Sequence, residues 1–321
     1  MKAWTLPEPS VMRYEELPIP VPAPNQVLIH NQAVCFCNGS DPGIYRGDAG
    51  YAFPMLFGHE ASGIIEQIGS QVSDFQVGDR VGWWCTIGVF AEYVAVNPRD
   101  VAMFRLPPNV SVTESPVTEL VIASARALMP FSGHAAGRTL TILGLGPSGL
   151  VCAQYARVLG FSKVYGLDLY ESRRKQALGF GADAVLNPAS PEFEQAMSEL
   201  PGADVALDMM GDDLLPGEPT FNTLLSGMKS GARVVSYGHP DHGRHFRPAA
   251  FQGLNLTLTH PENELSVIRE KGRAVMESLH MGDIRITPLV THVLPFEEAG
   301  NAFRRMLDSP EQYIKVVFTI P

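Results

Sequence analysis

Cysteine is scarce in this sequence of 321 residues. The four cysteines are Cys35, Cys37, Cys85 and Cys152. A cytosolic chain is not expected to carry a disulfide framework, so each cysteine is expected to be a buried apolar residue, a metal ligand or a nucleophile. No apolar run approaches the roughly 20 residues needed to cross a bilayer, and the first residues lack the apolar stretch of a signal peptide. We therefore expect a cytoplasmic protein without a membrane partner.

Concentrated positive charge is also missing. The chain has 24 Lys and Arg against 34 Asp and Glu, for a net charge of −10. Its densest cationic run, residues 173–175, stands beside Glu171 and is interpreted as a solvated helix face. Because such a chain has no basic surface to displace the counterions of a phosphate backbone, no nucleic-acid partner is expected.

Two patterns divide the chain, whose length suits two domains. Residues 1–121 contain short apolar segments broken by Pro and Gly, typical of a partly open β-barrel or sandwich. In residues 122–261 apolar strands alternate with helical segments, which predicts a doubly wound parallel sheet and an α/β fold. Residues 262–321 are too few to fold alone and are expected to return to the first domain. The six parallel strands are expected at 139–143, 163–168, 184–186, 204–208, 233–236 and 255–259.

A glycine motif, GLGPSG, occupies residues 144–149. It follows the strand 139–143 and begins an apolar helical run, so its glycines would permit a tight turn and let a pyrophosphate approach the helix N-terminus. The next strand ends at Asp168, and an acid there accepts hydrogen bonds from ribose hydroxyls and repels a 2′-phosphate, which favours NAD over NADP. The alternative is a glycine-rich turn in another α/β sheet. The expected cofactor contacts are Gly144, Gly146, Pro147, Ser148, Gly149, Asp168 and Arg173.

A candidate metal site begins with the adjacent pair His59 and Glu60. Cys37 and Asp41 lie upstream. Thiolate, imidazole and carboxylate are ligands of catalytic zinc sites, which keep one position open for water or substrate. A histidine beside a glutamate is more often structural, so the pair alone indicates a metal only weakly.

Five stretches of the chain match one family pattern: 54–63 (PMLFGHEASG), 75–81 (FQVGDRV), 90–94 (FAEYV), 144–149 and 287–302 (TPLVTHVLPFEEAGNA). Together they resemble the medium-chain dehydrogenase/reductase superfamily, in its zinc-dependent alcohol and polyol (sorbitol) dehydrogenase branch. The resemblance implies a GroES-like β-barrel catalytic domain, a Rossmann domain and a homodimer, with a tetramer as the alternative. It also implies hydride transfer between NAD(H) and a small alcohol or its carbonyl product, with Zn²⁺ acting as Lewis acid.

The resemblance also implies individual roles. Glu60 is similar to the carboxylate that binds or exchanges onto the metal, Asp41 to the acid that orients the zinc-bound imidazole, and Ser40 to a proton-relay hydroxyl. The implied catalytic residues are thus Ser40, Asp41 and Glu60. The implied metal ligands are Cys37, His59, Glu60 and Glu119.

Three departures from the family pattern stand out. The segment 37–41 is one residue longer than usual, so either a small bulge restores the geometry or Cys35 takes part; Cys37 is favoured. The relay histidine that many members carry after this segment is absent. The four-cysteine structural zinc lobe should lie between residues 81 and 119, where only Cys85 occurs, so one zinc per chain is expected.

Two other functions compete with a zinc dehydrogenase. One is a zinc-free, NADPH-dependent quinone or enone reductase of the same superfamily, which Cys37, His59 and Asp168 argue against. The other is a non-catalytic NAD-binding protein, which has no need of a metal-ligand set. A histidine cluster formed by His239, His242 and His245 is interpreted as a surface loop and not as a second metal site.

Overall fold

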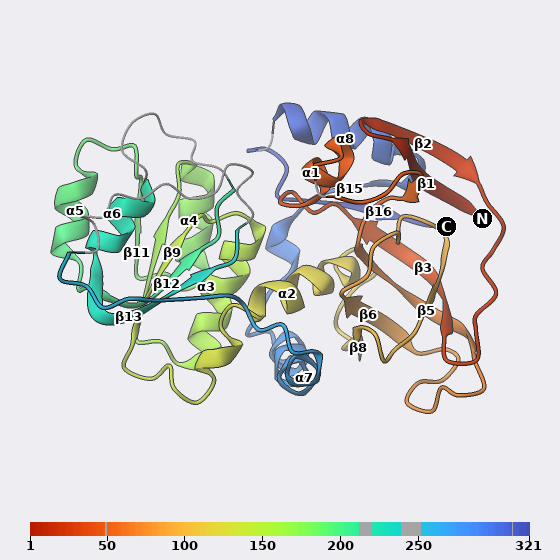
Figure 1. Cartoon of the computed structure of the whole chain (residues 1–321), viewed down its shortest axis with the longest axis horizontal. Coiled ribbons are helices and arrows are strands. Elements are labelled where there is room, and N and C mark those ends of the chain that lie inside the picture. Colours follow the sequence, from red (N-terminus) through yellow and green to blue (C-terminus); the bar gives the residue numbers. More distant parts are fainter. Residues whose placement is uncertain (49, 212–219, 239–251, 310) are drawn as a thin grey trace. The chain divides into compact units, whose positions relative to one another are not determined.

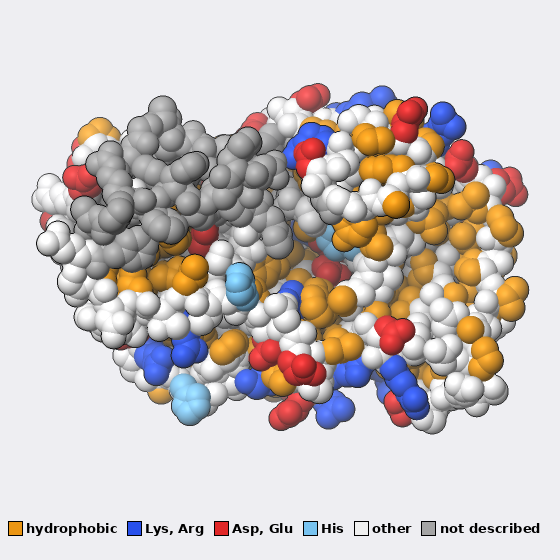
Figure 2. Space-filling model, viewed as in Figure 1, with side chains coloured by type: hydrophobic (Ala, Val, Ile, Leu, Met, Phe, Trp, Pro, Cys, Tyr) orange, Lys and Arg blue, Asp and Glu red, His pale blue; other side chains and the backbone are white. Residues whose placement is uncertain are grey.

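The computed structural model describes residues 1–48, 50–211, 220–238, 252–309 and 311–321. The histidine cluster of residues 239–245 lies outside these ranges. None of the helices within them has the length and apolar character needed to span a membrane. Acidic and basic side chains are interspersed on the visible face of the described residues (Figure 2).

The chain divides into two compact units (Figure 1). Unit 1 comprises Met1–Ala123 and Glu264–Pro321, and unit 2 comprises Ser124–Asn263. The sequence predicted divisions after residues 121 and 261, and each of these lies two residues before the division that the structure shows.

Unit 1 is built on mainly antiparallel strands in two sheets. The smaller has the order β2-β1-β4; the larger has the order β15-β16-β3-β5-β6-β8, with β7 also paired to β3. The C-terminal strand β16 pairs with β3, with Val317 opposite Cys35. The end of the chain therefore adds strands to the sheet that the N-terminal segment begins. The strands are β1 Lys2–Glu8, β2 Val11–Glu16, β3 Val27–Cys35, β4 Met55–Leu56, β5 Glu60–Ile68, β6 Arg80–Trp84, β7 Tyr93–Val96, β8 Ala102–Arg105, β15 Val290–Pro295 and β16 Lys315–Thr319.

An aromatic cluster forms the core of unit 1. The Phe36 ring packs on Phe318 at a centroid distance of 4.7 Å and stacks on Phe90 at 5.3 Å. Phe36 and Phe57 immediately precede the two segments that carry the candidate metal ligands, so the core fixes both segments. The helices of this unit are α1 Asp41–Arg46, η1 Ser115–Val117, α2 Thr118–Ala125 (which ends in unit 2), α7 Leu265–Met281, η4 Thr287–Leu289, η5 Phe296–Glu298 and α8 Ala299–Asp308.

Unit 2 is a six-stranded parallel sheet of order β11-β10-β9-β12-β13-β14. With the strands numbered along the chain, this order is 3-2-1-4-5-6, which is the order of dinucleotide-binding sheets. The order in which successive strands are added to the sheet reverses at β9, while all the strands stay parallel. The predicted α/β fold class is confirmed. The elements are β9 Thr139–Leu143, β10 Lys163–Leu167, β11 Ala184–Leu186, β12 Ala203–Asp208, β13 Met228–Ser236, β14 Thr257–Thr259, η2 Met129–Phe131, α3 Pro147–Leu159, α4 Glu171–Gly179, α5 Phe193–Glu199 and α6 Thr220–Ser226.

Candidate active site

Strand pairing brings the two metal-site segments together. Cys35, at the end of β3, pairs with Glu60, at the start of β5. Cys37 and His59 lie just beyond this pair, one on each segment. Gly58 turns the chain before His59 with φ of +73°, and a Cβ there would lie 2.0 Å from Cδ2 of Phe90. A side chain at position 58 is therefore excluded by both the backbone and the packing.

Three potential ligands converge at this point. The ligand atoms of Cys37, His59 and Glu60 all lie within 4.8 Å of one another, and within the described ranges no other trio of such side chains does so. Cys35 is outside the trio; it is fully buried, and burial raises the pKa of its thiol. Glu119, also outside the trio, is buried in the first turn of α2. Burial raises the pKa of Glu119 to about 8, against the opposing charge of His59.

Asp41 contacts two of the candidate ligands, Cys37 and His59. Its carboxylate is fully buried; Oδ2 accepts a hydrogen bond from the Cys37 backbone N–H at 2.8 Å, and Oδ1 lies 3.1 Å from Nδ1 of His59. A proton on Nδ1 facing Asp41 leaves the Nε2 lone pair for a metal, the usual arrangement of a ligating histidine. The Ser40 hydroxyl lies 3.3 Å from this Nε2.

Lys315 forms a fully buried ion pair with Glu60. Its Nζ lies 2.6 Å from each carboxylate oxygen and donates to the Phe36 carbonyl at 2.5 Å. Burial raises the pKa of Glu60, and the Lys315 charge opposes this shift. Burial alone would lower the pKa of Lys315, but the negative groups around it outweigh burial and raise it. Sequence reasoning missed Lys315, although a lysine that begins the buried apolar strand KVVFT was a signal.

The extra residue in the segment 37–41 is accommodated by a turn. The backbone N–H of Asp41 donates to the Cys37 carbonyl at 3.2 Å, which closes the turn. Nδ2 of Asn38 donates to the Tyr313 carbonyl at 2.6 Å and anchors the turn to the segment before β16. The longer spacing therefore leaves the Cys37 thiol within reach of His59.

The glycine motif joins β9 to α3, and its three glycines meet different demands. Gly144 adopts φ of +93°. A Cβ on Gly149 would lie 2.0 Å from the Gly144 carbonyl oxygen, so this glycine allows α3 to pack closely. A Cβ on Gly146 would meet no atom within 4 Å. Neither packing nor φ requires glycine at position 146. The open space beside this residue would let a ligand approach the backbone closely. Pro147 and Ser148 then begin the helix.

Asp168 lies beside this motif. Its Oδ2 accepts a hydrogen bond from the Leu145 N–H at 2.8 Å, and its Oδ1 accepts one from the Tyr170 N–H at 2.8 Å. Arg173 lies 3.9 Å from Oδ2, with its guanidinium 4.6 Å from the centroid of the Tyr170 ring. The interpretation of residues 173–175 as a solvated face is correct for Lys175, whose side chain is 73% exposed, and wrong for Arg173, at 14%. The aromatic ring and the acid draw Arg173 inward.

Comparisons with known proteins agree with this geometry. A model of the alcohol dehydrogenase GroES-like domain matches residues 23–108, and a model of zinc-binding dehydrogenases matches residues 147–276. Sorbitol dehydrogenase of Ovis aries is 28% identical, over 92% of this chain and 90% of the relative. Probable D-xylulose reductase A of Aspergillus terreus is 26% identical over 92% of each chain. The crystal structure of galactitol-1-phosphate dehydrogenase from Escherichia coli shares the fold, with a TM-score of 0.86, 22% identity and 100% coverage of both chains.

The chain therefore belongs to the medium-chain dehydrogenase/reductase superfamily, in its zinc-dependent alcohol and polyol dehydrogenase branch. It is an oxidoreductase of the alcohol and polyol class, as the resemblance implied.

Proposed function

We propose that this enzyme transfers hydride between NAD(H) and a polyol or secondary alcohol, with one zinc ion per chain. The observation that carries the proposal is the convergence of Cys37, His59 and Glu60 within 4.8 Å. Thiolate, imidazole and carboxylate form a ligand set suited to catalytic zinc, and the buried Glu119 is the candidate for a further ligand. When bound, zinc supplies the Lewis acidity that acidifies the alcohol, and NAD supplies the hydride acceptor. The names of the sorbitol and xylulose relatives support a polyol substrate.

The side chains around the metal trio have distinct tasks in this proposal. Asp41 fixes the tautomer and orientation of His59. Ser40 is the residue that would receive the alcohol proton and pass it on to water, because its hydroxyl lies at the candidate metal site, 3.3 Å from Nε2 of His59. Lys315 holds the Glu60 carboxylate in one position and supplies its counter-charge.

Replacing Asp41 by asparagine is expected to weaken zinc binding by about 10- to 100-fold. Both oxygens of Asp41 face hydrogen-bond donors, whereas an amide has one oxygen and turns an N–H₂ group toward the second donor. Competition with a chromogenic chelator measures the zinc affinity. Asp48→Asn, at an exposed acid paired with Arg46, is the control and should leave the affinity unchanged. Equal affinities for wild type and Asp41→Asn would refute a role in orienting His59.

Cofactor choice in this proposal depends on Asp168. Its carboxylate is held in place by two backbone N–H groups and retains lone pairs that can accept from ribose hydroxyls. The same negative charge would repel a 2′-phosphate. A preference for NAD over NADP therefore follows.

The variant Asp168→Ala is expected to lower the ratio of kcat/KM for NAD to that for NADP by about 10- to 100-fold, the equivalent of one or two charged hydrogen bonds. Steady-state kinetics with both cofactors and a panel of polyols and secondary alcohols measures the ratio and tests the function itself. Asp183→Ala removes another acid of unit 2, paired with Arg157 and Lys163, and should leave the ratio unchanged. An unchanged ratio in Asp168→Ala would rule out this basis for specificity.

The expected homodimer is supported by β14. This short strand ends the order of the described parallel sheet, and its Leu258 is 64% exposed. An edge strand of this kind offers unpaired backbone groups to a second copy. Sedimentation should therefore give twice the chain mass of 34.9 kDa, and Leu258→Lys should shift the protein toward monomer; a monomeric wild type would disprove the dimer.

A further inference from the structure

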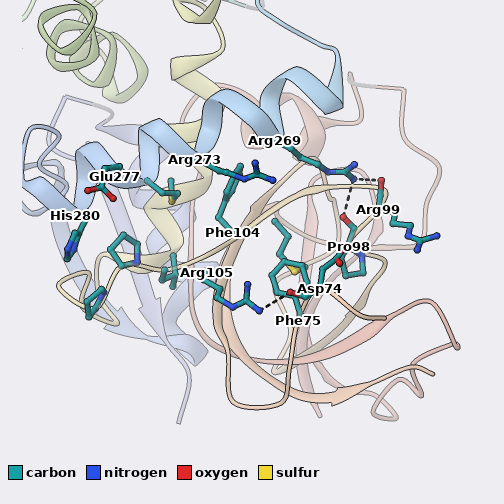
Figure 3. Close-up of a pocket in the computed structure, with 15 residues that line it drawn as sticks. Asp74, Phe75, Pro98, Arg99, Phe104, Arg105, Arg269, Arg273, Glu277 and His280 are labelled. Atoms are coloured by element: carbon teal, nitrogen blue, oxygen red, sulfur yellow. Dashed lines mark hydrogen bonds between the residues drawn. The ribbon is translucent and has the colours of Figure 1, made fainter. Parts of the chain in front are cut away.

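A pocket of about 640 Å³ lies within unit 1, apart from the candidate metal ligands (Figure 3). One wall is helix α7, and the other is β8 with its flanking loops. In Figure 3, Arg269 extends from α7 toward Pro98 and Arg99, and Arg273 lies beside Phe104. Glu277 and His280 lie further along the same helix. None of its lining residues belongs to the metal trio or to the groups that hold it. The site proposed above therefore gives this pocket no role.

Close packing of α7 on β8 forms the floor of the pocket. Gly272 of α7 faces the Phe104 ring, and a Cβ on Gly272 would lie 2.4 Å from Cζ of Phe104. The ring is therefore pressed against the helix backbone. Met103 and Met276 are also buried beside it. The floor is thus an apolar surface with one aromatic ring.

Two arginines brace the pocket walls. Arg269 donates through Nε and Nη2 to the carbonyl of Val101 and through Nη2 to those of Pro98 and Arg99, which ties the loop before β8 to α7. Arg105 donates to the Asp74 carbonyl at 2.8 Å and forms an ion pair with Asp79 at 2.8 Å. The positive charge of Arg105 is therefore compensated by an acid, whereas that of Arg269 is met only by carbonyl dipoles.

The pocket concentrates positive charge in a chain whose net charge is −10. Four arginines line it against two acids, Asp74 and Glu277. Within the described part of the chain, the Arg273 guanidinium makes no hydrogen bond or ion pair, and Nη1 of Arg269 donates no hydrogen bond. Glu277 lies one helical turn from Arg273 without forming an ion pair within 4.0 Å. Arg269 and Arg273, on one face of α7, therefore have N–H groups without a hydrogen-bond acceptor among the described residues, and these groups lie above an apolar floor.

We propose that this pocket binds a small organic anion, in which a phosphate or carboxylate group is attached to an apolar or aromatic body. Arg273 and Arg269 hold the charged group, because a guanidinium offers paired N–H donors that match the oxygens of such anions. The body lies on the half-buried side chains of Phe75 and Leu106, beside Phe104 and Met276, where it covers apolar surface. A volume of about 640 Å³ accommodates a ligand of this size.

The test is a calorimetric titration of the whole protein with 1-naphthyl phosphate. We expect saturable binding, weakened about tenfold in Arg273→Gln because one charged contact is lost. Arg304→Gln is the matched control: this exposed arginine on α8 lines a different pocket, and its loss should not change the affinity. Uncharged 1-naphthol should bind at least about tenfold more weakly than the phosphate, since it offers the arginines no charge.

Competition separates this pocket from the dinucleotide site. Saturating NAD should leave 1-naphthyl phosphate bound, because the glycine motif and the α7 pocket share no residue. The proposal is overturned if the phosphate does not bind, if Arg273→Gln binds as tightly as wild type, if 1-naphthol binds equally well, or if NAD displaces the probe. None of these results bears on zinc or on alcohol oxidation, so this proposal and the proposed function fail separately.

Discussion

Replacing Lys315 by methionine is expected to lower the free energy of unfolding by about 3–5 kcal/mol, because the change leaves the Glu60 carboxylate buried without its partner. Both side chains have no exposed surface, and their desolvation is offset only while the pair is intact. Urea unfolding, in the presence of a chelator so that metal binding does not contribute, measures the loss. Lys163→Met, which removes a half-exposed partner of Asp183, should cost less than about 1 kcal/mol.

A second variant separates the lost ion pair from lost packing. The double variant Lys315→Met, Glu60→Gln removes both charges of the pair and should recover a large part of the loss. In the single variant, the pKa of Glu60, already raised by burial, loses its opposing cation and rises further. A carboxyl whose pKa is raised in the folded state favours folding when protonated, so the destabilisation should grow as pH rises through that pKa. A double variant no more stable than the single one would contradict the buried ion pair.

The variants Cys37→Ser and His59→Ala are each expected to lose alcohol oxidation by about a thousandfold or more. Lewis-acid stabilisation is worth several kcal/mol, and each 1.4 kcal/mol corresponds to about a factor of ten in rate. Initial rates of NADH formation with the best polyol of the panel measure the loss. Cys85→Ser changes an exposed cysteine outside the trio and should keep wild-type activity. Substantial activity in His59→Ala would show that this imidazole is not needed for the chemistry.

The parallel sheet could be predicted from the sequence because its signals are local. The strand β9, with the sequence TLTIL, is buried along its whole length and contains no charged residue, and the glycine motif follows it directly. The predicted range of strand β13 was shorter than the observed one, because the pairing register changes within the strand. β13 begins at Met228, before the predicted residue 233, because Met228 pairs with Ala203 ahead of an irregularity in the ladder.

The polar contacts of the site could not be predicted in the same way, because they join distant segments. Lys315 reaches Glu60 across 255 residues of sequence, and Asn38 reaches Tyr313 across 275. No periodicity encodes such pairs. The inward turn of Arg173 likewise depends on where Tyr170 and Asp168 lie in space. The resemblance to a family named Cys37, His59 and Glu60, which converge in the structure, but not the lysine that pairs with Glu60.

The central claim of this account is that Cys37 and His59 hold a zinc ion. Elemental analysis of the protein purified without chelator tests it most directly. We expect about one zinc per chain in the wild type, and almost none in Cys37→Ser and His59→Ala. A wild-type protein that contains no zinc and still oxidises a polyol with NAD would contradict the claim.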